Sequence, residues 1–351
     1  QLPHCRACFV IGSLFFYLLS SPLSFIYKQT VLKGSTHRRP PSAFFFLKMP
    51  GRRQRLLFEQ TATPEQAAII SKVPDISAGT VVIVEATAGA GKSWVCAKVI
   101  DRLMAESADA LFAYLAFNTS VKVEMCDRVS DDMVDTTFKI TTYCKFAMNI
   151  LEKNGFQLIF VDEQKKSISP VQWLFRFAKD NNLVQAQVIT YLKFHNLKMD
   201  LQEYAVYLLE RRKGEDADFA QFSYEEQEGT VQATIQEIKD LLTCIIEKRE
   251  CHGLYALQFI SVAMHALDTD LLSCLPSSGL TIVDEAQDID PNLLYILEKL
   301  SVTHPIMVVG DSEQAINGWN GAKDSLQKFK QHPNALVFPL TETFRMGKNI
   351  V

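Results

Sequence analysis

A chain of 351 residues, 48% of them apolar, is long enough for two or three folding units with buried cores. Its net charge of -4 excludes a generally basic nucleic-acid-binding protein, because residues 1–60 hold nine Lys and Arg against one acidic residue and the remainder holds 27 against 39. A nucleic-acid-binding surface would therefore be a local patch. Cys5 and Cys8 form the only Cys-x-x-Cys pair, and no second pair or spaced histidines complete a zinc site.

The first 48 residues need a separate interpretation. The apolar stretch from Phe9 to Tyr27 is nominally long enough to cross a bilayer, but a glycine, a proline and four serines make it a poor span. The lack of acidic residues before Glu59 partly fits an organelle transit peptide. Because the chain starts with Gln1, and Met49 opens a basic segment ahead of the first motif, we favour misassigned upstream sequence or the edge of a fragment.

From residue 57 onward, short apolar segments alternate with helical ones. The expected strands are Thr80 to Glu85, Leu111 to Phe117, Leu280 to Val283 and Ile306 to Val309, with helices from Lys92 to Met104 and after Asn118. This alternation predicts an α/β fold with a doubly wound parallel sheet, helices on both faces and ligands at the carboxyl ends of the strands.

Between Tyr143 and Ser278 the pattern becomes helical. Helical periodicity runs through Pro170 to Asp180, Leu183 to Arg212 and Tyr224 to Arg249, with an acidic linker from Gly214 to Glu228. These segments predict a mostly helical inserted subdomain within the α/β domain.

A glycine-rich segment follows the first strand and leads into a helix. It consists of Ala86, Thr87, Ala88, Gly89, Ala90, Gly91, Lys92 and Ser93. Backbone N–H groups of such a loop can bind phosphates, and the helix adds the positive end of its dipole. Lys92 would contact the β and γ phosphates and the Ser93 hydroxyl would ligate Mg²⁺. The usual pattern begins with glycine, where this chain has Ala86.

Two adjacent carboxylates follow the strand that ends at Val283. Asp284 is the candidate metal carboxylate, and Glu285 is the candidate base that orients and deprotonates the attacking water. The competing interpretation is an acid-rich helix amino end, which the helix dipole favours. Gln314 follows the next strand, where its neutral amide could reach a γ phosphate.

These motifs together resemble a known family. The phosphate loop, DEAQD, VGDSEQAINGWNGA and LTETFR occur in the order and spacing of the UvrD/Rep group of superfamily 1 helicases, and LAFNTS resembles the F-box DNA helicase branch. The resemblance covers roughly residues 57 to 350. It implies two RecA-like domains with helical insertions, ATP and Mg²⁺ as ligands, and 3′-to-5′ movement on single-stranded DNA.

The resemblance also implies roles for single residues at the nucleotide. Gln66 would read the adenine edge, although a polar residue in the first turn of a helix begun by Pro64 explains it equally well. Phe344 would stack on adenine and Arg345 would contact the γ phosphate.

On the nucleic-acid side, Trp319 matches an aromatic on which a base stacks, with a packed core residue as the alternative. The segments expected to line the strand contain Phe117, Asn118, Thr142 and Tyr143; for the two aromatics a core position is the alternative. Asn317 and Asn320 stand where the family often has an aromatic and an arginine, and Cys144 stands where it commonly has a histidine. These differences would weaken binding to DNA.

The expected division is an N-terminal extension, the first RecA-like domain in two parts separated by the helical insertion, and the start of a truncated second domain. The extension covers residues 1–56, and the two parts of the first RecA-like domain cover 57–150 and 251–345. The helical insertion between them covers 151–250, and the start of the second domain covers 346–351. The resemblance implies that the second domain supplies an arginine that completes the nucleotide site. Without that domain, we expect this chain to bind Mg-ATP but to hydrolyse it weakly, since such an arginine contributes roughly 10³ to 10⁵ to the rate of phosphoryl transfer.

The sequence leaves several alternatives open. Another P-loop NTPase, or a short ATP- or nucleic-acid-binding module, would also carry the phosphate loop. RNA is an alternative to DNA, because backbone-tracking channels with stacking aromatics accept either sugar. We expect a nuclear protein without stable membrane association, with the mitochondrion as the alternative indicated by the acid-free N-terminal segment.

Overall fold

The computed structural model describes residues 61–107, 110–129, 139–197, 201–215, 221–276, 278–315 and 325–344. The N-terminal extension, Trp319 and Arg345 lie outside the described residues, as do Asn317 and Asn320. All described residues belong to one compact unit, Leu57–Val351. None of its described helices is long and apolar enough to cross a membrane.

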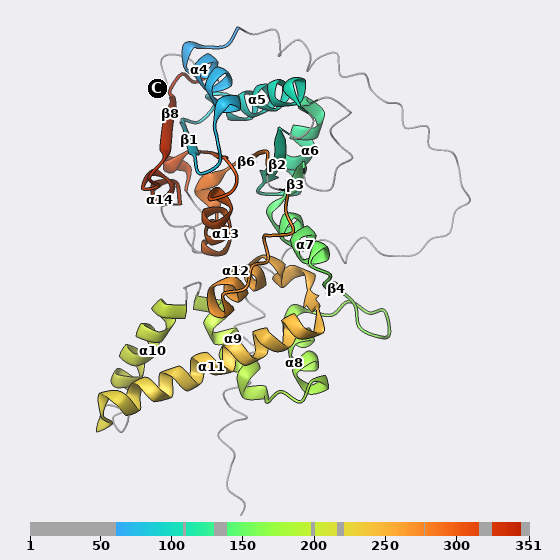
Figure 1. Cartoon of the computed structure of the whole chain (residues 1–351), viewed down its shortest axis with the longest axis vertical. Helices are drawn as coiled ribbons and strands as arrows, with labels where there is room; N and C mark the ends of the chain where they lie inside the picture. Colours follow the sequence, from blue (N-terminus) through green and yellow to red (C-terminus); the bar gives the residue numbers. More distant parts are fainter. Residues whose placement is uncertain are drawn as a thin grey trace, which may run out of the picture. The chain divides into compact units, whose positions relative to one another are not determined.

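A parallel sheet is the centre of the α/β part (Figure 1). In the described chain it has six strands in the order β3-β2-β6-β7-β1-β8, and every neighbouring pair is parallel. The strands are β1 (Val81–Ala86), β2 (Leu111–Ala116), β3 (Ile140–Thr142), β6 (Leu280–Val283), β7 (Ile306–Gly310) and β8 (Ala335–Leu340). The predicted α/β fold with a RecA-like parallel sheet is therefore confirmed.

Both faces of the sheet are buried. Along β1, Val82 and Val84 join an apolar cluster with α4 (Pro64–Lys72), α5 (Lys92–Glu106) and α6 (Thr119–Arg128). Val81 and Ile83 join a second cluster on the opposite face. This alternation explains why the strand reads as an uninterrupted β-branched run: a strand covered on both sides has no position for a polar side chain.

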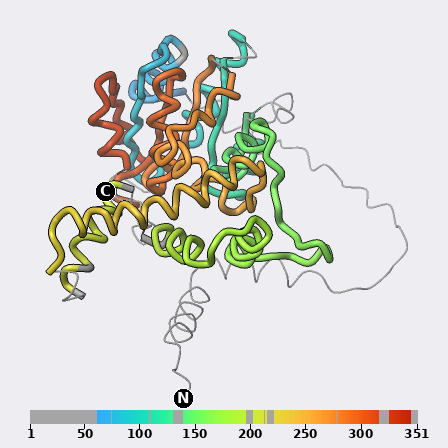
Figure 2. The backbone as a smooth tube through the Cα atoms, turned by 60° about the horizontal axis from the view of Figure 1, so that its bottom comes forward, coloured from blue at the N-terminus to red at the C-terminus, as the bar shows by residue number. Residues whose placement is uncertain are grey.

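The second cluster extends from the sheet into the helical part of the chain. Its helices are α7 (Tyr143–Lys153), α8 (Pro170–Asp180), α9 (Gln185–Leu197), α10 (Leu201–Glu215), α11 (Tyr224–Lys248), α12 (Ala256–Leu267), α13 (Pro291–Ser301) and α14 (Ser325–Lys330). The long helix α11 lies against α9 (Figure 2). A small parallel pair, β4 (Gln157–Ile159) and β5 (Glu250–His252), brings the two ends of the helical segment together.

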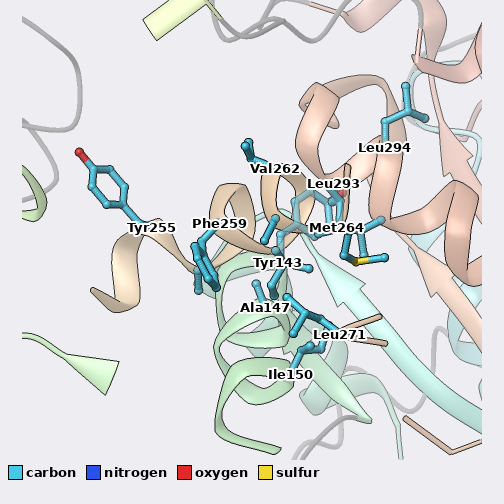
Figure 3. Packing of buried hydrophobic residues seen from close by; sticks show 14 of the residues in the cluster. Tyr143, Ala147, Ile150, Tyr255, Phe259, Val262, Met264, Leu271, Leu293 and Leu294 are labelled. Atoms are coloured by element: carbon cyan, nitrogen blue, oxygen red, sulfur yellow. The ribbon is translucent and has the colours of Figure 1, made fainter. Parts of the chain in front are cut away.

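Helices α7, α12 and α13 form the layer that joins the sheet to the helical segment. Figure 3 shows Tyr143 and Ala147 of α7 beside Phe259 and Met264 of α12, with Leu293 of α13 next to them. Packing of apolar side chains therefore continues without interruption from the sheet into the helical part.

The structure corrects two details of the expected elements. The acidic linker from Gly214 to Glu228 is wrong at both ends, because α10 continues to Glu215 and α11 begins at Tyr224. The expected helix start at Tyr224 is confirmed, and Ser223 caps it in a capping box with Glu226. The segment from Leu183 to Arg212 contains two helices, α9 and α10, rather than one continuous stretch. Strands β3, β4, β5 and β8 were not expected from the sequence.

We predict that the α7–α12 packing carries much of the stability. Phe259 is 1% exposed and meets Phe156 edge to face, with 5.5 Å between ring centroids. Phe259→Ala should lower the free energy of unfolding by about 3–5 kcal/mol, measured by urea denaturation, because a large cavity is left. Val302→Ala, at a position 70% exposed, serves as the control and should cost less than about 0.5 kcal/mol. Equal effects of the two changes would contradict a large contribution of this packing to stability.

Candidate active site

The carboxyl ends of all six strands lie at one edge of the sheet, because the strands are parallel. The candidate residues follow these ends directly. Thr87 follows β1, Phe117 follows β2, Tyr143 follows β3 and Asp284 follows β6, whereas the residues after β7 and β8, Asp311 and Thr341, were not among the candidates. The sheet thus brings together residues from six separate parts of the chain.

The phosphate loop connects β1 to α5. Gly89 and Gly91 have φ of 78° and 83°, in the region that favours glycine, and α5 begins at Lys92. A Cβ atom on Gly91 would lie 3.0 Å from Gln66 Nε2, so a larger residue there would also press on that side chain. Ala86 is the last residue of β1 and is buried, and the extended backbone of a strand accepts its methyl group. The N–H groups in the first turn of α5 have no acceptor within the helix.

Neighbouring residues hold the carbonyl oxygens of this loop. Thr343 Oγ1 donates to Ala88 O at 2.8 Å, the Phe344 N–H donates to Gly89 O at 3.0 Å, and Gln66 Nε2 donates to Ala90 O at 3.2 Å. Thr87 also donates its N–H to Leu340 O at 3.0 Å. The loop is therefore fixed in shape by α4 and by the residues after β8, which favours binding because little further ordering is needed.

Gln66 and Phe344 lie close to the same glycine. Gln66 is 4% exposed, and its Oε1 accepts from the Thr63 N–H at 3.1 Å as part of the capping box of α4. Phe344 is 54% exposed, with its ring 4.0 Å from where a Cβ of Gly91 would lie. The structure thus brings both predicted adenine-contacting residues beside the loop; their roles stay predictions.

Asp284 is a buried carboxylate, 1% exposed. The Tyr114 hydroxyl donates to its Oδ2, and the Glu285 N–H donates to its Oδ1 at 2.9 Å. Burial raises the pKa of Asp284 to about 6, while the hydrogen bonds and the nearby Lys92 ammonium oppose this rise. Such a carboxylate is held in one orientation, as a metal ligand needs to be.

Glu285 lies beside the phosphate loop. Its Oε2 is 3.4 Å from Lys92 Nζ and accepts from Gln287 Nε2 at 2.8 Å. Its backbone has φ of 52°, a left-handed conformation that costs roughly 1–2 kcal/mol for a residue with a side chain. The Lys92–Glu285 ion pair joins the two motifs that are almost 200 positions apart in the printed sequence.

Gln287 links this acid pair to the end of β7. Its Oε1 accepts from the Asp311 N–H at 3.0 Å, and a Cβ on Gly310 would lie only 2.6 Å from that oxygen. Gln314 donates from Nε2 to Asp311 Oδ2 at 2.6 Å, so in this structure its amide faces Asp311. Its predicted reach to a γ phosphate stays a prediction.

The candidate nucleic-acid residues follow β2 and β3. Asn118 and Thr142 are the N-caps of α6 and α7, each accepting from a backbone N–H in the first turn. Phe117 is 38% exposed, whereas Tyr143 is 6% exposed and donates its hydroxyl to the Asp284 carbonyl. Tyr143 therefore occupies the core position that the sequence left as the alternative.

Two residues of the site escaped sequence reasoning. The sequence places Tyr114 in an apolar strand and Gln287 in the DEAQD motif, but its pattern indicates no role for either residue. A register irregularity in β2 between Leu111 and Ala113 places Phe112 and Ala113 in the same cluster, so Tyr114 falls on the α5 face. A strictly alternating pattern would give the opposite face.

The residues present fit a magnesium-bound nucleotide. In the described part of the chain no group of three or more His, Cys, Asp or Glu side chains is arranged to hold a metal ion by itself. Mg²⁺ commonly uses one or two protein ligands together with phosphate oxygens and water. Ser93, in the first turn of α5, and Asp284 supply such a sparse set.

The sheet, the preformed loop and the buried acid pair define an α/β protein with a RecA-like domain and a candidate nucleotide site. The family model of the UvrD/REP helicase N-terminal domain matches residues 63–334. The chain therefore belongs to the UvrD/REP helicase N-terminal domain family. Helicases of this family hydrolyse ATP with Mg²⁺ and bind DNA. No curated protein matches the chain.

We predict that Asp284→Asn stabilises the metal-free protein in a pH-dependent way. Because the pKa of Asp284 is about 6 when folded and about 3.9 when unfolded, the folded state binds more protons between these values and stability falls as pH rises through them. At pH 8 and without Mg²⁺, thermal denaturation should show Asp284→Asn more stable by about 1–3 kcal/mol. The difference should vanish near pH 4.

The control for this measurement is Glu247→Gln, which removes an exposed carboxylate of α11. It should change stability little at either pH. An Asp284→Asn gain as large at pH 4 as at pH 8 would contradict a cost arising from the buried charge.

Proposed function

We propose that this chain binds Mg-ATP at the carboxyl edge of its sheet and hydrolyses it to drive movement on single-stranded DNA, as the ATP-binding part of a helicase. The observation that carries the proposal is the 3.4 Å ion pair between Lys92 and Glu285, beside the buried Asp284. It joins a phosphate-binding loop to a candidate base in one site.

The residues divide the chemistry between them. Lys92 and the loop N–H groups would neutralise phosphate charge, while Ser93 and Asp284 would hold Mg²⁺, which acts as a Lewis acid on phosphate oxygens. Glu285 would orient and deprotonate the water, supported by the Gln287 amide. Phosphates would compete with Glu285 for the Lys92 ammonium, which would release the carboxylate for that task.

Further residues extend the proposed site toward the base and the γ phosphate. Gln66 and Phe344 would contact adenine, and both lie beside Gly91. Gln314 and Arg345 would contact the γ phosphate, an assignment that rests on the family resemblance. The LTETFR segment already touches the phosphate loop through Thr343 and Phe344.

On the DNA side, the proposal assigns Phe117, Asn118 and Thr142 to the strand-lining surface, with Trp319 as the stacking aromatic. The first three are supported by their position at the ends of neighbouring strands, next to the nucleotide site. RNA is the alternative ligand. The 3′-to-5′ direction and the F-box branch belong to the same proposal and rest on the resemblance of the motifs. The division into 57–150, 151–250 and 251–345 rests on the pattern of strands and helices in the sequence. The proposal also includes a nuclear location, with the mitochondrion as the alternative.

We predict that Glu285→Gln separates nucleotide binding from hydrolysis. Removing the carboxylate while keeping the shape should lower single-turnover hydrolysis of radiolabelled ATP by about 10²–10⁴-fold, the usual contribution of a general base. Binding of a fluorescent ATP analogue should be kept or strengthened, because the Glu285 carboxylate no longer competes with the phosphates for Lys92.

Two comparisons make this result specific. Lys92→Ala should instead weaken the binding of the nucleotide, and Glu247→Gln in α11 should leave both quantities unchanged. Hydrolysis retained by Glu285→Gln would contradict the assignment of the base. Hydrolysis by the wild type without any binding of single-stranded DNA would favour a P-loop NTPase of another kind.

A further inference from the structure

Two buried tyrosines converge on Asp284 from different elements. Tyr114 of β2 donates its hydroxyl to the carboxylate, whereas Tyr143, the first residue of α7, donates its hydroxyl to the backbone carbonyl. Tyr114 therefore holds the candidate metal ligand itself. Tyr143 holds the peptide that leads from Asp284 to Glu285.

The orientation of that peptide matters for the candidate base. The Asp284 carbonyl and the Glu285 N–H belong to one planar unit, so fixing the carbonyl also fixes where the backbone of Glu285 begins. Glu285 adopts a left-handed φ of 52°, which persists only where surrounding contacts hold it. The Tyr143 hydroxyl and Asp284 Oδ1 provide such contacts on the two sides of the peptide.

The other side of Tyr143 faces the candidate nucleic-acid surface. Its ring meets Phe117 edge to face, with centroids 6.0 Å apart and an interplanar angle of 79°. Phe117 is 38% exposed at the end of β2, next to Thr142 at the end of β3. Phe117 is therefore the point at which a bound strand would reach the contacts that hold Glu285.

Tyr143 is packed tightly enough to transmit a displacement. It is 6% exposed and lies in the cluster formed with α12 and α13, as Figure 3 shows. Close-packed interiors leave little room for a side chain to absorb a push locally. A movement of Phe117 would therefore shift the Tyr143 ring, and the hydroxyl on the Asp284 carbonyl would move with it.

We propose that Tyr143 is a positioning residue that couples occupation of the Phe117 surface by single-stranded nucleic acid to the placement of Glu285. This proposal rests on the function proposed above, since it needs both a nucleotide site and a strand-binding surface. Tyr143 acts through Glu285 and touches neither reacting group.

Tyr143→Phe tests this coupling directly, because the ring and its packing stay while only the hydroxyl is lost. Single-turnover ATP hydrolysis by the full chain is measured with and without a single-stranded oligodeoxynucleotide, and the ratio of the two rates is the readout. For wild type we expect a ratio above one. For Tyr143→Phe we expect this ratio to fall toward one. Where the wild-type ratio is large enough, the fall should be about fivefold or more, because couplings between sites usually begin at about that size.

Tyr114→Phe is the matched comparison. It removes the other buried hydroxyl on Asp284, on the carboxylate rather than the carbonyl, and its ring belongs to the cluster on the opposite face of the sheet. It should lower both rates together and leave their ratio unchanged. Tyr255→Phe is the control for loss of a buried hydroxyl elsewhere; Figure 3 shows Tyr255 at the far end of the cluster, and both rates should match wild type.

Thermal unfolding and the affinity for a fluorescent ATP analogue accompany these rates. The coupling is supported if the Tyr143→Phe protein unfolds like Tyr114→Phe and binds the analogue within about twofold of wild type, while DNA no longer raises its rate of hydrolysis. General damage would instead change unfolding or binding as well. A wild-type ratio in Tyr143→Phe overturns the coupling and leaves the proposed function standing. A wild type that DNA does not stimulate overturns the proposed DNA-driven function, and the coupling with it.

Discussion

The site depends on keeping one ionisable carboxylate, Asp284, inside the protein at the end of a fully buried strand. Burial disfavours its charged form, as the raised pKa of about 6 shows. The Tyr114 hydroxyl and the Glu285 N–H offset part of this cost. Strands that end together can hold such a group, because backbone and side-chain donors from neighbouring elements then converge on one point.

The strand order explains why the site needs contacts across a third strand. Strand β7 lies between β1, which carries the phosphate loop, and β6, which carries the acid pair. Gly310 at the end of β7 has no side chain, and Gln287 occupies the space beside it and binds the Asp311 N–H. Gln287 also binds Glu285, and the ion pair of Glu285 with Lys92 reaches the loop after β1, so polar contacts connect the three strand ends.

The sequence predicted those parts of the fold and site in which local pattern and tertiary role agree. Buried apolar runs marked β1, β2, β6 and β7, and the glycine-rich loop marked Lys92. Strand β8 escaped because Pro339 interrupts its apolar run, and a proline within a run argues against a strand. Tyr114 escaped because its face is set by a register irregularity in β2, which depends on pairing with β6 and not on neighbouring residues.

Tyr143 shows why a choice between core and functional roles can be the wrong division. A tyrosine has an apolar ring that packs and a hydroxyl that needs a partner when buried. Here the ring packs with α12 and α13 and meets Phe117, while the hydroxyl binds the carbonyl beside Glu285. Phenylalanine would satisfy the packing alone, and a solvent-facing tyrosine could contact a strand but not the acid pair. The one position that reaches both is a buried one, at the end of β3 where the two surfaces adjoin.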